Sequence, residues 1–156
     1  MNNVSNTLDK SLANRKILKN YLDSIETNDL FKIPDGFNNN IIWQIGHVIS
    51  VQQQLVYGLS GLPLHVSKEF TKKYGRGSFP DAQVNEETVE ELQSLLFTTL
   101  ETIKEDLEKD IFKNFTPYKT LPGIVLESVS DALEFNNFHD DLHLKRIKSL
   151  TEALHP

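Results

Sequence analysis

The sequence has no cysteine among its 156 residues, and only one methionine and one tryptophan. Without cysteine the chain can form no disulfide, present no thiolate nucleophile and hold no metal through sulfur. The absence fits a reducing compartment, so we expect a cytoplasmic protein. No run of about 18 apolar residues occurs, which argues against a membrane-spanning helix. The polar N-terminal stretch MNNVSNTLDK is unlike a signal peptide.

Positive charge is also scarce. The chain has 16 Lys and Arg residues against 22 Asp and Glu, which gives a formal net charge of -6. A phosphate backbone is bound by clustered basic side chains, so nucleic acid is not expected as a partner. With 38% hydrophobic and 24% charged residues the composition is globular. The length predicts one domain over residues 1–156.

Helical spacing of apolar residues dominates the chain, and the strict alternation typical of β-strands is missing. The spacing predicts four long helices, at about 8–25, 40–57, 85–111 and 124–154. Asn39 or Asn40 is the expected N-cap of the second helix. The connection over 60–83 is long, so it is either a crossover along the bundle or a lid over a site. The predicted fold is all-α, a four-helix bundle with a long crossover between helices two and three.

Two histidines interrupt the apolar stripe of the last predicted helix. His139 and His143 are four positions apart, so they share a face with Cβ atoms about 5–6 Å apart and can approach one ion. Asn136 precedes them on the same stripe, whereas Asp140 and Asp141 are expected to point to the sides. Such a pair is often solvated or hydrogen-bonded within a core. A metal would satisfy both rings, since an unpaired polar group in a core costs roughly 1–3 kcal/mol.

A third histidine, His47, falls on the inner face of the second predicted helix. Taken alone, it is as well explained by a core histidine bonded to a neighbour. If helices two and four are neighbours, however, it faces the pair and completes a three-histidine metal site. Gly46 costs the helix up to about 1 kcal/mol relative to alanine, so it predicts close approach of a neighbouring helix or a ligand.

Other polar residues around these histidines are candidates for supporting roles. Gln44 and Asn136 are each one turn from a histidine and could orient water or substrate. Trp43 lines the pocket or packs in the core. Asp140 either accepts a proton from the outer nitrogen of a metal-bound histidine or lies on the solvated surface. The two remaining histidines, His65 and His155, are expected on the surface.

The stretch DGFNNNIIWQIGHVISVQQQLVYGLSGLP, followed far downstream by FHDDLHLKRIKSL, resembles the DinB-like (YfiT-related) superfamily. The resemblance covers nearly the whole chain, and the NNNIIWQIGH block is its most specific part. It implies a four-helix bundle, commonly a homodimer, that holds nickel or zinc through His47, His139 and His143. It also implies thiol transfer, thiol-dependent isomerisation or hydrolysis on a small-molecule substrate, with a low-molecular-weight thiol as a partner.

The sequence departs from the pattern of that superfamily after each histidine of the pair. Asp140 stands where members often have the longer Glu, which puts a carboxylate role in doubt. Lys145 and Arg146 follow the second histidine where small or polar residues are usual. Their charge suits an anionic substrate, or simply a solvated helix surface.

Two hypotheses of function follow, and a third is disfavoured. The first is a metal-dependent enzyme that activates water or a thiol at the ion. The second is a non-catalytic bundle that binds metal or a partner. HDDLH also resembles the HExxH motif of zinc proteases. That interpretation is disfavoured because Asp140 is too short for the role of the glutamate, and only His155 follows His143 as a further ligand.

Overall fold

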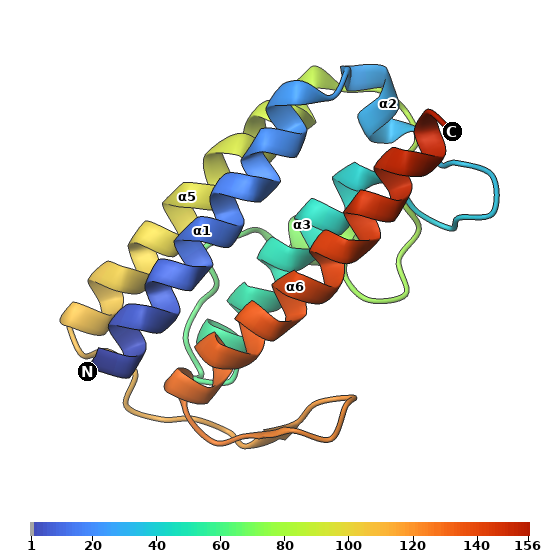
Figure 1. The fold of residues 1–156 in the computed structure, drawn as a ribbon. Coiled ribbons are helices and arrows are strands. Elements are labelled where there is room, and N and C mark those ends of the chain that lie inside the picture. Colours follow the sequence, from blue (N-terminus) through green and yellow to red (C-terminus); the bar gives the residue numbers. More distant parts are fainter. Residues whose placement is uncertain (1) are drawn as a thin grey trace.

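Four long helices carry the fold in the computed structural model, which describes residues 2–156. They are α1 (Asn2–Ser24), α3 (Ile41–Gln53), α5 (Glu86–Glu108) and α6 (Val129–Leu154). Figure 1 shows α1 beside α5 and α3 beside α6, and α1 also packs on α6. The predicted all-α bundle is confirmed. So is the packing of the second long helix against the last, which the three-histidine hypothesis required. Among the helices described, none is long and apolar enough to cross a membrane.

Five shorter elements connect the long helices. They are α2 (Thr27–Phe31), the π-helical turn η1 (Gln54–Gly58), α4 (Lys68–Tyr74), β1 (Tyr118–Lys119) and β2 (Val125–Leu126). The two strands pair antiparallel, with Tyr118 opposite Leu126. This hairpin occupies the segment in which the last helix was predicted to begin. The predicted start near Ile124 is therefore wrong, because α6 begins at Val129.

Short polar side chains define where the long helices begin. The Asn40 side chain accepts a hydrogen bond from the Trp43 amide at 2.8 Å. Asn85 and Ser128 cap α5 and α6 in the same way. Each cap satisfies an amide that has no partner inside its helix. At its other end α5 stops at Glu108, short of the predicted 111, because Asp110 takes a left-handed conformation with φ of 54°.

The long crossover contributes α4, which packs against α3. Its last residue, Tyr74, lays its ring directly over Gly46. A Cβ atom on Gly46 would lie 2.3 Å from Cδ1 of Tyr74, so only glycine permits the contact. The close approach predicted from this glycine is confirmed, and a neighbouring helix makes it. The crossover is thereby fixed beside His47.

Two apolar clusters fill the bundle, one towards each end. One includes Leu18, Ile45, Leu92 and Ile147, and the other includes Val56, Ile103 and Leu133. Buried polar residues fall between these clusters on every long helix: Asn14 and Arg15 on α1, Gln52 on α3, Thr99 on α5, and Asn136, Asp140 and His143 on α6. A polar layer therefore crosses the middle of the bundle, and the histidines lie along it.

Candidate metal centre

Three imidazoles from two helices meet in this layer. His47 comes from α3, and His139 and His143 come from successive turns of α6. One nitrogen from each lies within 4.8 Å of the other two, and Nε2 of His139 is 3.0 Å from Nε2 of His143. Nitrogens bound to one ion at about 2.0–2.1 Å are roughly 2.8–3.4 Å apart at octahedral or tetrahedral angles. The cluster therefore fits a divalent ion after small side-chain adjustments.

Hydrogen bonds to the outer nitrogens orient two of the three rings. Nδ1 of His47 donates to the carbonyl oxygen of Tyr74 at 2.9 Å. Nδ1 of His143 lies 2.5 Å from Oε1 of Gln44, to which it donates. Because both oxygens accept hydrogen bonds, the proton belongs on Nδ1 and the lone pair on Nε2. Metal-bound histidines are held in this way, so both rings have the tautomer that a metal needs.

Trp43 fixes the plane of the His47 ring. The two rings stack with centroids 4.6 Å apart and planes inclined by 11°. The indole is held in turn, because its Nε1 donates to Oγ of Ser78 at 2.9 Å. Trp43 thus covers one side of His47 and keeps water from it. Trp43 was predicted either to line the site or to pack in the core. Its ring contacts the site, and its side chain is also buried.

The site keeps its imidazoles neutral. Burial is the main cause that lowers the pKa of all three rings, to about 4 for His139 and about 2 for His143. The neighbouring histidines lower the pKa of His139 and of His143 further. The charge of Arg146 adds to the lowering of all three pKa values, and that of Arg76 acts on His47 as well. Metals bind the neutral ring. The lone pairs therefore remain available far below neutral pH.

Of the predicted supporting residues, Gln44 holds the ring of His143 through its Oε1 atom. Asn136 is buried at 1% exposure, and neither atom of its amide finds a partner within the described residues. His65 and His155 lie on the surface as expected, with side chains 44% and 76% exposed. They pair there with Asp106 and Asp29.

Asp140 departs from both of its predicted roles. It is only 2% exposed, so the expectation of a surface position is wrong. It also accepts no hydrogen bond from a histidine in the described residues, and instead faces α1, where Asn14 donates to it at 3.4 Å. Burial raises the pKa of Asp140 to about 6, and the nearby charge of Arg15 partly offsets that rise.

Arg15 was missed by the sequence analysis. Its side chain is fully buried in the polar layer. It donates to the Leu96 carbonyl at 3.0 Å, to Thr99 at 3.3 Å and to Oε1 of Gln52. A signal was present, because Arg15 lies seven residues after Leu8 and three before Leu18, on the apolar face of its helix.

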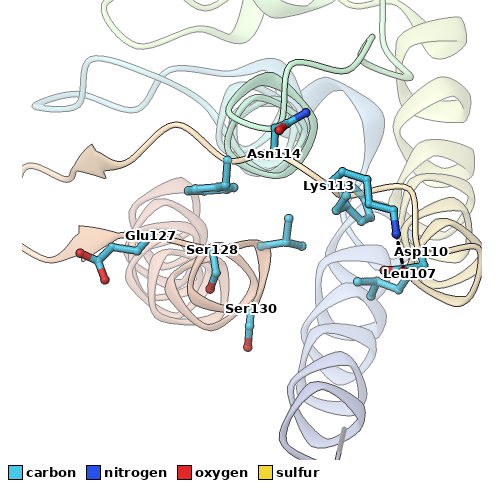
Figure 2. A pocket seen from close by; sticks show the side chains of 10 residues that line it. Leu107, Asp110, Lys113, Asn114, Glu127, Ser128 and Ser130 are labelled. Carbon is cyan, nitrogen blue, oxygen red and sulfur yellow. Dashed lines mark hydrogen bonds and ion pairs between the residues drawn. The ribbon is translucent and has the colours of Figure 1, made fainter.

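One surface pocket lies away from the histidines. It has a volume of about 460 Å³ and lies between the end of α5 and the start of α6. Figure 2 shows Lys113 paired with Asp110 on one side, and Ser128 and Ser130 at the beginning of α6 on the other. His139 is about 15 Å further along α6, at 1.5 Å per residue. This pocket does not belong to the metal centre.

Fold and site together define a helical bundle with a buried three-histidine cluster that could hold a metal ion. Residues 12–147 match the family model described as the DinB superfamily. The match covers most of the chain, and the protein belongs to this superfamily. A comparison with curated proteins finds no match.

Proposed function

We propose that the protein is a metal-dependent enzyme that acts on a small molecule, by hydrolysis or by transfer of a low-molecular-weight thiol. The observation that carries the proposal is the convergence of three neutral imidazoles without a fourth protein ligand among the described residues. Structural zinc sites are usually closed by four protein ligands, whereas catalytic sites keep a position open. When bound, a divalent ion such as nickel or zinc would supply the Lewis acidity that activates water or a thiol at neutral pH.

The residues of the chain have distinct parts in this proposal. His47, His139 and His143 present their Nε2 atoms. Tyr74 and Gln44 keep the protons of His47 and His143 on the outer nitrogens, so that neither ring turns away. Trp43 shields His47 on one side, while His139 is only half-buried and leaves a way in from solvent.

The charges around the site favour thiol transfer over hydrolysis. Apart from the histidines themselves, the charges that act on the three rings are those of Arg146 and Arg76, and no carboxylate acts on them within the described residues. Asp140, the carboxylate next to His139, is turned towards α1. Water attack is usually assisted by a general base. A thiol ionises more readily, since its ordinary pKa is about 8.5, and positive charge assists that ionisation.

Metal analysis of the purified protein tests the site. The wild-type chain should take up close to one equivalent of nickel or zinc, and His143→Ala should lose most of its affinity. His155→Ala is the matched control, because it removes an exposed histidine just past the end of α6 and should bind metal as the wild type does. A wild-type protein that takes up neither metal would exclude the proposed centre.

A thiol-transfer screen tests the reaction. The loaded protein would be assayed with a generic electrophile and several small thiols, alongside His143→Ala and His155→Ala. Turnover that depends on metal and is lost only in His143→Ala supports the enzyme.

The second candidate is a non-catalytic metal-binding bundle, which is favoured because no carboxylate of the described residues contacts His47, His139 or His143. It predicts metal uptake without turnover, together with a clear fall in melting temperature on chelation. Free metal at a concentration of 100 times its Kd would contribute about 2.7 kcal/mol to the free energy of unfolding.

A further inference from the structure

A second surface pocket, with a volume of about 420 Å³, opens beside the metal centre. The loop around Gly36 forms one wall, with Asn38 and Asn39, and α6 forms the other, with Lys145 and Arg146. Gln44 also lines the pocket, and the same side chain holds His143. One residue, Gln44, therefore contacts both the pocket and the histidine cluster.

The lining is suited to an anion. Lys145 and Arg146 are exposed, and within residues 2–156 neither forms an ion pair. No acidic side chain lines the pocket, while Asn38 and Asn39 add amide groups that can donate. A guanidinium binds a carboxylate or phosphate through two parallel hydrogen bonds, and a lysine beside it adds a further charge.

The distance to the histidines suits a small molecule. Arg146 is three residues after His143 on α6, so their Cβ atoms lie about 5–6 Å apart on neighbouring turns. A small ligand held by Arg146 would therefore lie about one helical turn from His143.

We propose that this pocket binds an oxyanion, a carboxylate or a phosphate, on the thiol or substrate whose reacting end lies at the three histidines. The inference rests on the proposed function and adds a substrate class to it, namely small anionic thiols or thiol acceptors. Arg146 is assigned as the main specificity residue, with Lys145 beside it.

Calorimetric titration of the metal-loaded protein with matched thiols tests this assignment. The neutral compounds are mercaptoethanol and mercaptohexanol, and their anionic counterparts are mercaptoacetate, mercaptohexanoate and mercaptoethyl phosphate. At least one anionic thiol should bind about tenfold more tightly than its neutral counterpart, as expected for one charge-assisted contact. The carboxylate and phosphate arms show which oxyanion the pocket takes.

Variants separate the pocket from the metal. Arg146→Gln should remove the preference for the anionic thiol and leave metal uptake unchanged. Lys148→Gln is the matched control, because it removes one exposed positive charge from the same helix outside the pocket. Equal binding of anionic and neutral thiols by the wild type, or an unchanged preference in Arg146→Gln, would overturn the inference while the metal-dependent function stands.

Titration with succinate and inorganic phosphate, without any thiol, makes the two failures distinguishable. If no thiol binds, but succinate or phosphate binds to the wild type and not to Arg146→Gln, the anion pocket stands and the thiol function fails. If no thiol and neither anion binds, both the anion pocket and the thiol function fail.

Discussion

The carbonyl oxygen of Tyr74 accepts a hydrogen bond from Nδ1 of His47 across 2.9 Å. This bond joins the crossover to the metal centre, because Tyr74 is the last residue of α4. The ring of the same tyrosine lies on Gly46, the residue before His47. One residue of the crossover therefore sets both how closely α4 approaches α3 and which nitrogen of His47 carries the proton.

Substitution of Gly46 by alanine should weaken metal binding without touching a ligand. The new Cβ would displace the Tyr74 ring and its carbonyl, and overpacking of this kind costs about 1–3 kcal/mol. We expect metal affinity to fall by about 10- to 100-fold, as for the loss of other groups that orient a ligand. Competition with a chelator measures the affinity. Gly58→Ala is the control, since a Cβ there would meet only Leu64, at 3.9 Å. Equal affinities of the two variants would contradict the role of Tyr74.

Gln44→Leu should lower metal affinity by a similar factor, about 10- to 100-fold, because His143 loses the acceptor that fixes its tautomer. The fold should survive, since leucine is of similar size and the position is buried among apolar residues of α3. Gln54→Leu, at an exposed site beyond the end of the same helix, provides the comparison. If Gln44→Leu binds metal as the wild type does, then Gln44 does not orient His143.

Helical spacing was enough to place the three histidines, because i and i+4 share a face in any α-helix. The same argument failed for Asp140, which is 100° around α6 from His139. In an isolated amphipathic helix that direction is a flank. Here α6 packs against both α3 and α1, so its buried face is wide enough to include Asp140 as well as the histidines. Which helices become neighbours is a property of the whole chain, and local patterns do not show it.

The hairpin before α6 was missed for a related reason. Val125 lies at helical spacing from Val129, so the apolar pattern continues across the true boundary at Ser128. Ser128 and Asp131 gave a capping signal, since Ser128 accepts from the Asp131 amide. Short polar residues are common in helices and loops alike, so the signal did not outweigh the pattern.

Loss of the buried guanidinium should strongly destabilise the bundle. Arg15→Leu leaves Oε1 of Gln52 without its donor and removes the positive charge that most offsets the burial of Asp140. Breaking a buried charged network by removing one member costs about 3–5 kcal/mol. Urea unfolding of Arg15→Leu and the wild type measures the difference in their free energies of unfolding. Lys16→Leu, at the exposed neighbouring position, should change the free energy of unfolding by no more than about 0.5 kcal/mol.

The double variant Arg15→Leu/Asp140→Leu separates two explanations for that loss. If the cost in Arg15→Leu comes from an uncompensated Asp140, removal of both charges should recover much of the stability. A double variant that is no more stable than Arg15→Leu would show that the two side chains are not coupled.

Asp140→Asn should change how stability depends on pH in the metal-free protein. Burial raises the pKa of Asp140 from 3.8 to about 6 in the folded state, so the folded chain holds this proton more tightly than the unfolded chain does. The resulting stability is present below pH 3.8 and is lost as the pH rises to 6. Asparagine has no proton to lose. The variant should therefore match the wild type at low pH and exceed it at neutral pH, by about 3 kcal/mol for a shift of this size.

Urea unfolding at a series of pH values, with a chelator present, measures this difference. The histidines with lowered pKa values titrate in both proteins, so their contributions to the pH dependence cancel in the comparison. Asp141→Asn removes the exposed carboxylate beside it and should stay within about 0.5 kcal/mol of the wild type throughout. A gap between Asp140→Asn and the wild type that stays constant from acid to neutral pH would mean that burial does not raise the pKa of Asp140.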